Sequence, residues 1–371
     1  MINYKNLLPV IIVVFLLLAS GSSAEIDFGG YYKNTFLYLS PKRGDGILAD
    51  VNKLRLRFEA DILSNVFVHL EPDYAFLIKP KDIPLIEVSE LDKVVLDRAW
   101  VKVIFPQADL IVGKQRIAWG TGYLWNPTDV FNPFALAFAV AEEERRGIDA
   151  MRIQIPLGIA SGVEGVVLTD KEWNALEKSK KGIKARTNIG MYDLSLSYVA
   201  LGDEGFQFGF DTAGELFGLG VRSEIAWVNT AEASDYFKAI FGWNYTFENG
   251  LGIDMEYFYN GLGKKNKADY DWSGFFAGDI YQLGMDYIYF GLNYMIDEIT
   301  DIRLSFLVNA DDSSFMVYPS YSRNIFENVD LSLEALLVGG EEGGEFNPSS
   351  AEDASGFLGS NMLFLKVRYS F

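Results

Sequence analysis

The C-terminal segment of the chain, residues 361–371, alternates strictly between two kinds of side chain. One face consists of Leu363, Leu365, Val367, Tyr369 and Phe371, and the other consists of Phe364, Lys366, Arg368 and Ser370. Because successive side chains of a β-strand point to opposite sides, the segment is predicted to form a ribbon with one apolar and one wet face. The same pattern recurs along most of the chain. It favours an all-β fold, a transmembrane antiparallel up-and-down β-barrel.

A candidate export signal precedes the first alternating segment. Lys5 supplies a positive start, an apolar run follows over residues 7–19, and Ser22, Ser23 and Ala24 form a small-residue cleavage site. We expect residues 1–24 to be removed and residues 25–371 to form one barrel domain. An uncleaved anchoring helix is the alternative, but the apolar run is shorter than the roughly 20 residues that a membrane span needs. The chain has no Cys, which excludes a cysteine-linked lipid anchor and any disulfide.

The composition suits a wall between lipid and water. Aromatic residues make up 15% of the chain, while charged residues still make up 22%. Tyr, Trp and Phe gather at membrane interfaces, and charged side chains suit an aqueous lumen. The net charge of −19 leaves no basic excess to neutralise phosphates, which argues against a nucleic-acid partner. The expected partners are membrane lipids and lipopolysaccharide, a small-molecule solute and, through the C-terminal strand, the outer-membrane assembly machinery.

Eighteen segments are predicted to be strands. The clear ones are residues 54–62, 66–74, 94–105, 110–116, 151–155, 183–189, 194–198, 221–227, 239–247, 253–259, 288–295, 302–308, 315–321, 331–338 and 361–371. Three segments are weaker because Gly interrupts them: residues 31–39, 158–168 and 206–210. Bacterial single-chain barrels have even strand numbers, with which a count of about 18 agrees. A 16-stranded barrel is the alternative if residues 206–210 and a neighbouring segment are loop.

Short and long connections alternate along the chain. Tight turns are predicted at residues 63–65, 106–108, 156–158, 248–250 and 297–299, and longer links at residues 41–50, 77–92, 117–147, 169–180, 260–286 and 340–358. In outer-membrane barrels the short turns face the periplasm and the long loops face the exterior. The alternation therefore predicts an outer-membrane location with both termini periplasmic. A soluble sandwich would need far fewer strands, and no fixed-period repeat supports a solenoid.

The charges on the predicted polar faces sort by sign along the chain. Basic side chains expected on one lumen wall are Lys53, Arg55, Arg57, Arg98, Lys102, Lys114, Arg116, Arg152, Lys184, Arg186, Lys366 and Arg368. Acidic side chains expected on the remaining wall include Asp193, Glu224, Asp254, Glu256, Asp301 and Glu334. Opposed charge across a wet lumen would orient dipolar or anionic solutes. The alternative is that lumen charges pair with one another, because Glu71 and Asp73 lie near the Arg residues.

The sequence carries no catalytic or metal-binding motif. The single His, His69, shares a polar face with Glu71 and Asp73, and no Ser nucleophile motif accompanies it. Its expected role is a hydrogen bond inside the lumen. No Cys/His cluster suits a transition metal, and no aspartate-rich loop suits calcium. We therefore expect no cofactor, no metal and no enzymatic activity.

Residues 117–147 break the alternation. Asn126-Pro127 and Asn132-Pro133 each place a capping side chain before a Pro suited to a first helical turn, and residues 134–146 are rich in helix formers. Such an apolar loop needs shelter from solvent. It is predicted to fold into the barrel as a constriction loop. Its key residues are Trp119, Trp125, Asn126, Pro127, Asp129, Phe131, Asn132, Pro133, Phe134, Phe138, Arg145 and Arg146. The alternative is a lid on the rim or a subunit contact.

Part of this region carries a family resemblance. The run from Gly113 through Arg116 to Trp119-Gly120, then Asn126-Pro127-x-Asp129 and Arg146-Gly147-x-Asp149, resembles uncharacterised Gram-negative outer-membrane barrels, the DUF1302-like group. It is also similar in style to porin-like and alginate-export barrels. The terminal Phe371 resembles the assembly signal of outer-membrane proteins. The resemblance implies a channel or transporter and names no substrate. The Trp-Asn-Pro form at residues 125–127 departs from the group's pattern.

These features predict a porin-like channel for passive transport of small solutes, with a basic lumen wall and an inward loop that set selectivity. The main alternative is a transporter of hydrophobic solutes, in which the apolar loop forms a binding pocket. An outer-membrane enzyme and an adhesive barrel are further alternatives. A pore profile separates these classes, because they require an open wet lumen, an apolar pocket or a plugged core.

Overall fold

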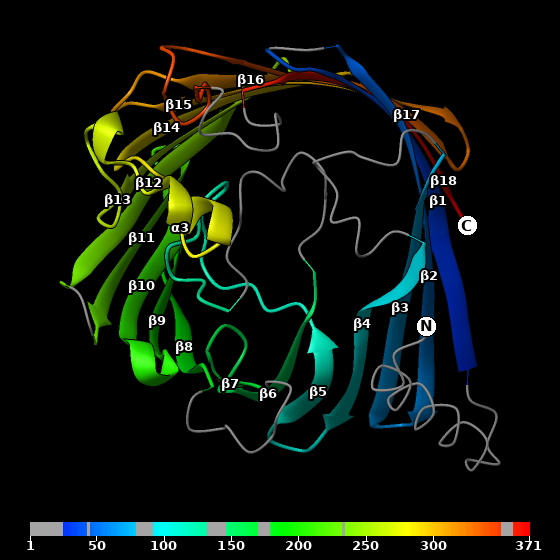
Figure 1. The fold of residues 1–371 in the computed structure, drawn as a ribbon. Coiled ribbons are helices and arrows are strands. Elements are labelled where there is room, and N and C mark those ends of the chain that lie inside the picture. Colours follow the sequence, from blue (N-terminus) through cyan, green and yellow to red (C-terminus); the bar gives the residue numbers. More distant parts are fainter. Residues whose placement is uncertain are drawn as a thin grey trace.

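The computed structural model describes residues 25–42, 45–78, 92–131, 146–169, 179–231, 234–349 and 359–371. Its strands form a single antiparallel sheet of 18 strands. The first strand, β1 (Glu25–Ser40), pairs with β2 (Ile47–Leu63) on one side and with β18 (Asn361–Ser370) on the other. The sheet therefore closes into an up-and-down barrel (Figure 1).

The intervening strands pair in sequence order. They are β3 (Val66–Leu77), β4 (Lys93–Ile104), β5 (Asp109–Gln115), β6 (Ile148–Pro156), β7 (Gly162–Leu168), β8 (Lys181–Ile189), β9 (Tyr192–Ala200), β10 (Gly205–Leu216), β11 (Leu219–Thr230), β12 (Tyr236–Thr246), β13 (Leu251–Asn260), β14 (Asp286–Asp297), β15 (Thr300–Asn309), β16 (Phe315–Phe326) and β17 (Val329–Gly339). Short helices lie in the connections: η4 (Gly202–Glu204), η5 (Lys267–Asp269) and α3 (Trp272–Ala277). No helix in the described ranges has the length and apolar character to span a membrane.

The predicted 18-stranded barrel is confirmed, and the 16-stranded alternative is wrong, because residues 206–210 belong to a regular strand, β10. Several strand ends differ from the predicted ones, and two of these differences change a predicted connection or strand noticeably. The link expected at residues 41–50 ends before Ile47, since the β1–β2 hairpin extends further than its apolar pattern indicated. Residues 158–161 form the turn before β7 rather than part of that strand.

Short turns lie at one end of the barrel and the longer connections at the other. Consecutive strands β2–β3, β8–β9 and β16–β17 are joined by two-residue turns, whereas β5–β6 and β13–β14 are joined across 32 and 25 residues. Because β1 starts and β18 ends at the same end of an even-numbered antiparallel barrel, both described chain ends lie with the short turns.

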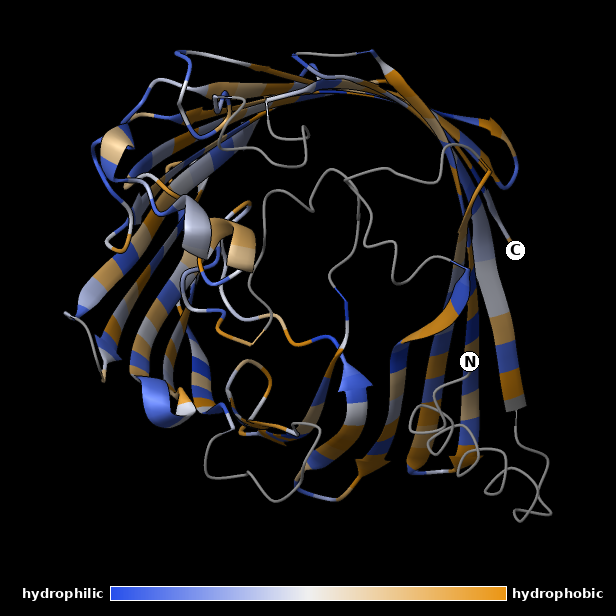
Figure 2. Ribbon diagram, viewed as in Figure 1, coloured by the Kyte–Doolittle hydropathy of each residue, from blue (hydrophilic) through white to orange (hydrophobic). Residues whose placement is uncertain are grey.

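Many large apolar side chains of the strands are exposed, as a lipid-facing outer surface requires. Along the strands, hydrophobic and hydrophilic residues alternate as expected (Figure 2). On β18, Leu363, Leu365 and Tyr369 are exposed, whereas Phe364 and Lys366 on the opposite face are buried. The predicted facing of this strand is therefore confirmed. A polar group interrupts the apolar face on β1 and β2, where Asn34 donates to Asp50 and Asn52 over 2.6 and 2.8 Å.

Candidate functional site

The segment that follows β5 runs inside the barrel along the inner wall. We call residues 117–131 the inner loop. Trp119 and Phe131 pack edge-to-face, with ring centroids 4.9 Å apart, against Ala150, Val166 and Val199 of β6, β7 and β9. Further along, the inner loop reaches β11 and β13 (Figure 1). It thus covers the inner wall from β6 to β14.

Two buried carboxylates hold the backbone of the inner loop. Glu224 of β11 accepts the N–H groups of Thr121, Gly122 and Thr128, the last two over 2.8 and 3.1 Å, and also the Thr128 hydroxyl over 2.8 Å. The carboxylate is fully buried. A hydrogen bond to a charged carboxylate is stronger than a hydrogen bond between neutral groups. The bonds to Glu224 therefore hold the backbone of the inner loop firmly against the wall.

The second carboxylate, Glu256 of β13, continues the same arrangement. It accepts the N–H groups of Tyr123, Leu124 and Trp125 over 2.6, 2.9 and 3.0 Å. The guanidinium of Arg222 donates to it from β11 over 3.0 Å. Glu256 is also fully buried, so the ion pair with Arg222 offsets part of the cost of burying its charge.

Glycines make this close approach of loop and wall feasible. At Gly120, φ is +95°, and a Cβ would lie 2.5 Å from a carboxylate oxygen of Glu224. At Gly209 of β10, a Cβ would lie 2.9 Å from the Thr128 methyl group. A side chain at either position would push the loop off the wall. The Gly that weakened the strand pattern of residues 206–210 therefore serves the packing of the inner loop.

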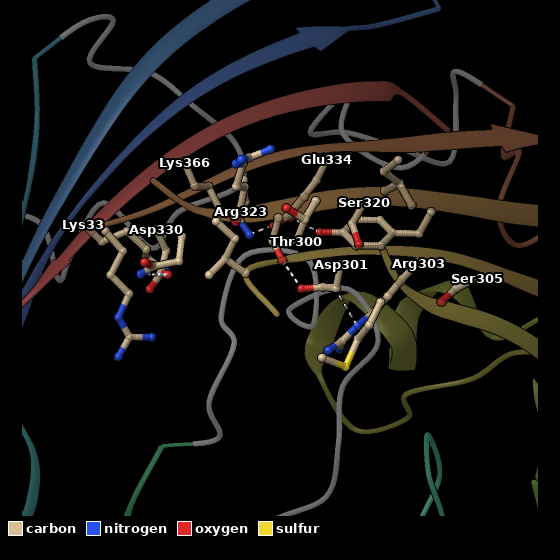
Figure 3. A pocket seen from close by; sticks show the side chains of 18 of the residues that line it. Lys33, Thr300, Asp301, Arg303, Ser305, Ser320, Arg323, Asp330, Glu334 and Lys366 are labelled. Atoms are coloured by element: carbon tan, nitrogen blue, oxygen red, sulfur yellow. Dashed lines mark hydrogen bonds and ion pairs between the residues drawn. The ribbon is translucent and has the colours of Figure 1, made fainter. Parts of the chain in front are cut away.

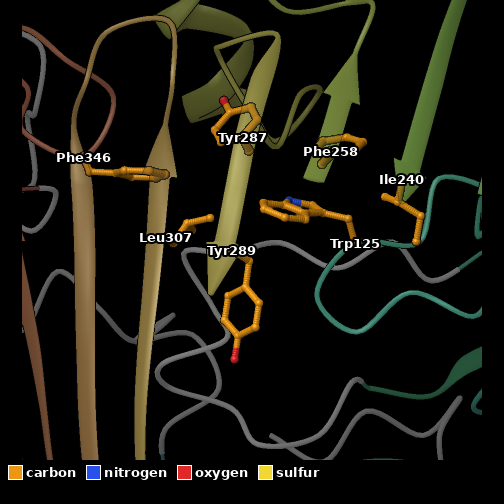
Figure 4. Packing of buried hydrophobic residues seen from close by; sticks show 7 residues of the cluster. All are labelled: Trp125, Ile240, Phe258, Tyr287, Tyr289, Leu307 and Phe346. Atoms are coloured by element: carbon orange, nitrogen blue, oxygen red, sulfur yellow. The ribbon is translucent and has the colours of Figure 1, made fainter. Parts of the chain in front are cut away.

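Trp125 anchors the far end of the inner loop in an aromatic cluster. Its ring stacks on Phe258 with centroids 5.1 Å apart, and Tyr287 lies at 5.8 Å (Figure 4). Ile240, Tyr289, Leu307 and Phe346 complete the cluster. Trp125 is only 3% exposed, so the loop itself fills the apolar recess of this wall.

The predicted loop residues fall into three groups. Trp119, Trp125, Pro127, Asp129 and Phe131 are buried on the inner wall, and Asn126 is half-buried. The Asn126-Pro127 pair begins a turn, closed by Asp129 N–H donating to the Asn126 carbonyl over 3.0 Å, and the helical start expected there is wrong. Arg146 is exposed, just before β6. Asn132, Pro133, Phe134, Phe138 and Arg145, with the helix expected over residues 134–146 up to Arg145, lie outside the described residues.

The cations expected to form a basic lumen wall are largely paired with carboxylates. Arg55 contacts Asp73 at 2.6 Å, Asp97 at 3.0 Å and Glu71 at 3.4 Å. Lys53 contacts the same Asp73 at 3.0 Å. The alternative that lumen charges pair with one another is therefore the one that holds on this wall, where carboxylates neutralise part of the basic charge.

Asp97 joins this network because the pairing of β3 and β4 contains a bulge. Glu71 pairs with Arg98 but Pro72 pairs with Leu96, which leaves Asp97 as an extra residue on β4. Asp97 and Arg98 can therefore both turn inward. Arg98 lies 3.4 Å from Glu71. Strict alternation cannot place Asp97 on the inner face, although a Pro within a strand pattern signals such a bulge.

Other predicted basic residues behave in the same way. Their partners are Asp109 for Lys102 at 2.7 Å, Glu164 for Arg152 at 2.5 Å, Asp211 for Lys184 at 2.8 Å and Glu334 for Lys366 at 2.7 Å. Arg368 lies 4.1 Å from the centroid of the Tyr31 ring. Arg57 and Arg186 are exposed and form no ion pair within the described ranges.

Two predicted inward cations are placed differently by the strand register. Lys102 pairs with Ile111, so Ile111, Gly113 and Gln115 share its face, and Lys114 lies on the opposite, outer face. Arg116 is exposed but lies one residue beyond the end of β5. The inward placement predicted for Lys114 is wrong, because the register pairs Lys114 with Ala99, on the face of the sheet opposite to that of Lys102.

The predicted acidic residues have distinct positions. Glu224 and Glu256 lie beneath the inner loop and do not contact the open lumen. Asp254 lies 3.8 Å from Arg222, Asp301 3.3 Å from Arg303, and Asp193 accepts a hydrogen bond from Asn188. Glu334 accepts from Tyr318 as well as from Lys366. The role of Glu224 and Glu256 as loop anchors was not evident from sequence, since their donors are backbone groups about 100 residues away.

His69 makes interior hydrogen bonds, as predicted. Its Nδ1 lies 3.0 Å from Glu59, its Nε2 lies 2.9 Å from Glu71, and its ring stacks on Trp100. Both ring nitrogens are therefore engaged by carboxylates. No group of His, Asp and Glu in the part of the chain described is arranged to hold a metal ion.

A polar hollow lies on the wall that the inner loop leaves open. It has a volume of about 960 Å³ and extends over β14–β18 and Lys33 of β1, with Tyr123 and Leu124 of the inner loop at one end (Figure 3). Asp301, Arg303 and Ser320 are among its lining residues. The lumen thus has an apolar sector filled by the inner loop and a hydrophilic sector that faces the hollow.

At the end of the barrel with the long connections, Glu345 ties loops together. It accepts hydrogen bonds from the Tyr287 hydroxyl, from Asn309 over 2.7 Å and from the Leu283 N–H over 3.2 Å. Burial raises the pKa of Glu345 from 4.5 to about 7. The carboxyl group of Glu345 therefore stays protonated up to a higher pH in the folded state than in the unfolded chain.

This pKa shift predicts that the stability of the loop contacts made by Glu345 depends on pH. Because the pKa of Glu345 is higher in the folded state, its contribution to stability is greatest below about pH 4.5 and declines as pH rises to about 7. Amide exchange at Leu283, corrected for intrinsic rates, should be about ten- to a hundredfold faster at pH 8 than at pH 5. Glu345→Gln should abolish the difference. Equal pH dependence in the wild type and this variant would contradict the assignment.

The comparisons with known proteins concern the fold. No protein-family model and no curated protein matches the chain. A triple-mutant porin of Rhodopseudomonas blastica superposes with a TM-score of 0.50 at 13% identity, over 94% of this chain and 100% of that one. OccAB3 of Acinetobacter baumannii superposes with a TM-score of 0.57 at 11% identity, over 94% and 99% of the two chains. The chain has a porin fold. Its identity to both neighbours is too low for the porin fold alone to assign a solute.

Proposed function

We propose that the chain is an outer-membrane channel of porin type through which small solutes pass passively. The observation that carries the proposal is the inner loop, held against one half of the inner wall by Glu224 and Glu256 beside an open polar hollow. A loop anchored in this way narrows a lumen without plugging it, which is what a selective passive channel requires.

The membrane placement rests on the exposed outer face and the ends of the barrel. Apolar side chains such as Leu196 and Phe241 point away from the lumen and suit contact with lipid and lipopolysaccharide. The short-turn end, where β1 begins and β18 ends, would face the periplasm. The C-terminal strand would then be the segment that the assembly machinery engages. A cleaved signal over residues 1–24 and the likeness to the DUF1302-like group stay proposals.

The alternative of a hydrophobic-solute transporter is less well supported. Its binding pocket would have to be the apolar sector of the lumen, but Trp125 occupies that sector with Phe258 and Tyr287. Catalysis is also disfavoured, because His69 is engaged by Glu59, Glu71 and Trp100, and none of these contacts among the described residues is with a nucleophile. We infer that the chain binds and passes solutes without converting them.

A liposome-swelling assay tests the proposal. Liposomes that contain the folded barrel should admit small hydrophilic solutes and exclude larger ones, since the inner loop narrows the lumen. Heat-denatured protein is the control. Liposomes that stay impermeable to every small solute, although the barrel is folded, would contradict the channel function.

The paired cations predict how selectivity responds to mutation. Replacing Arg55, Arg57 and Arg98 together with Gln should shift the reversal potential toward cations at low salt. The carboxylates of Glu71, Asp73 and Asp97 lose the Arg side chains that neutralise part of their charge. The same change should lower stability by about 3–5 kcal/mol, the usual cost of a buried charge left unpaired.

Arg57→Gln alone is the matched control. This side chain is exposed and has no ion pair in the described ranges, so its loss should shift selectivity slightly without a measurable loss of stability. Planar-bilayer reversal potentials and denaturant unfolding report the two effects separately. A triple variant with wild-type reversal potential and wild-type stability would show that these residues neither face the lumen nor pair as described.

A further inference from the structure

The polar hollow is electrically balanced. Among the described residues that line it, five are Lys or Arg and five are Asp or Glu, so the formal net charge of these residues is zero. Several of these charges are already paired: Lys366 with Glu334 at 2.7 Å and Arg303 with Asp301 at 3.3 Å. A simple anion or cation entering the hollow meets both signs at similar distances and gains little net attraction.

The strand register places hydroxyl groups in the middle of this balanced surface. Ser322 pairs with Asp301 on one side and with Ser332 on the other, and Ser332 pairs in turn with Lys366. Ser320 lies between Arg303 and Glu334 in the next row. The serines of β16 and β17 therefore form a strip through the hollow, with an acid and a base on each side. Figure 3 shows Ser320 among Asp301, Arg303, Glu334 and Lys366.

The hydroxyl groups of some of these serines are available for hydrogen bonds to a solute. Ser322 donates to Asp301, whereas the hydroxyls of Ser320 and Ser332 have no hydrogen-bond partner within the described ranges. A hydroxyl is both donor and acceptor. Groups that can likewise donate and accept match the strip better than groups that only accept, such as carboxylates, or only donate, such as ammonium groups.

A half-exposed aromatic ring closes one end of the hollow. Tyr123 of the inner loop stacks on Tyr289 with centroids 5.2 Å apart, and 52% of Tyr123 is exposed. The guanidinium of Arg222 lies 5.7 Å from the Tyr123 centroid. Because the backbone N–H of Tyr123 is fixed by Glu256, the ring has a defined position. It offers a flat apolar surface beside the hydroxyl strip.

We propose that the hollow binds neutral polyhydroxylated solutes, of the size of a mono- or disaccharide, as they pass through the barrel. Hydroxyl groups of the solute exchange hydrogen bonds with Ser320, Ser332 and the flanking ion pairs, and its less polar face packs on Tyr123. The proposal deepens the channel function proposed above and rests on it. It assigns a solute class that the porin fold alone does not indicate.

Three sugar derivatives of similar size and different charge, together with a smaller zwitterion, test the inference. Glucose, gluconate, glucosamine and the zwitterion serine are compared in liposome swelling and as modulators of single-channel current in a planar bilayer. Glucose should enter about three- to tenfold faster than gluconate and glucosamine, and it should reduce the open-channel current in a saturable way. Serine should enter more slowly than glucose after correction for size.

Variants that leave the anchoring carboxylates intact locate the site. Ser320→Ala combined with Ser332→Ala, and separately Tyr123→Leu, should each weaken the saturable glucose effect about three- to tenfold, measured relative to the ion conductance of the same variant without glucose. Ser64→Ala in the β2–β3 turn and Phe217→Leu in the β10–β11 turn are the matched controls, and neither should change it.

The outcomes separate the two proposals. A wild-type barrel that conducts ions but admits glucose and gluconate equally overturns the solute class and leaves the channel function standing. The same holds if serine, after correction for size, enters faster than glucose. Unchanged glucose affinity in both hollow variants likewise overturns the site. A folded barrel that conducts no ions and admits no solute overturns the channel function and the inference together.

Discussion

Replacing Glu224 and Glu256 together with Ala is expected to release the inner loop and to raise both the single-channel conductance and the solute size limit. Six backbone N–H groups of the loop lose their acceptors. A buried donor left without a partner costs about 1–3 kcal/mol. The position of the loop against the wall therefore becomes energetically unfavourable. Planar-bilayer recordings and swelling with oligosaccharides of graded length measure the two effects.

Milder variants separate loop release from loss of charge. Glu224→Gln keeps one acceptor oxygen for the loop and should give an intermediate conductance. Asp254→Asn removes a carboxylate from β13 that has no hydrogen bond to the loop, so it should leave the size limit unchanged. If the double variant folds and keeps the wild-type conductance and size limit, the inner loop is not what narrows the lumen.

Leu365→Arg is expected to impair assembly far more than an Arg placed on the lumen face. Leu365 is 39% exposed and lies between Phe36 and Leu333 on the outer face of β18. Arg on the lipid face near the membrane midplane costs about 2–4 kcal/mol. Folding yield and urea unfolding in liposomes should both report this loss.

The matched control for Leu365→Arg is Ser320→Arg, whose side chain enters the polar hollow. Phe364→Arg is less suitable, because Phe364 packs with Leu336 and Met362 in an interior apolar cluster and its loss has a cost of its own. Ser320→Arg should fold with a yield near the wild type. Equal yields for Leu365→Arg and Ser320→Arg would show that the lipid-facing and lumen-facing sides of β16 and β18 are misassigned.

The strands could be predicted from sequence because alternation is a local property. Residues 361–371 have an apolar face and a polar face in any barrel that lipid surrounds, and the same holds for residues 206–210 once Gly209 is accepted within a strand. The pattern fails where one extra residue is inserted, as at Asp97, or where a strand ends one residue early, as before Arg116. A shift of one residue exchanges the lumen and lipid faces that are assigned to all following side chains of the strand.

The anchoring of the inner loop could not be predicted from sequence. Its apolar residues indicated that the loop needs shelter, but Glu224 and Glu256 carry no signal that separates them from lumen-lining carboxylates such as Glu334. Their partners are backbone N–H groups, which every residue except Pro possesses. Only the course of the loop decides which carboxylates it covers. Gly120 and Gly209 are the residues whose unusual backbone or missing side chain marks the contact.

The most direct test of the channel function is the conductance of the folded, full-length barrel in a planar lipid bilayer. If the lumen is open beside the inner loop, insertion should produce discrete current steps of uniform size, and the current through each should be proportional to salt concentration at high salt. A barrel that inserts and shows the resistance to unfolding of a closed sheet, yet carries no current at any salt concentration, would contradict the account.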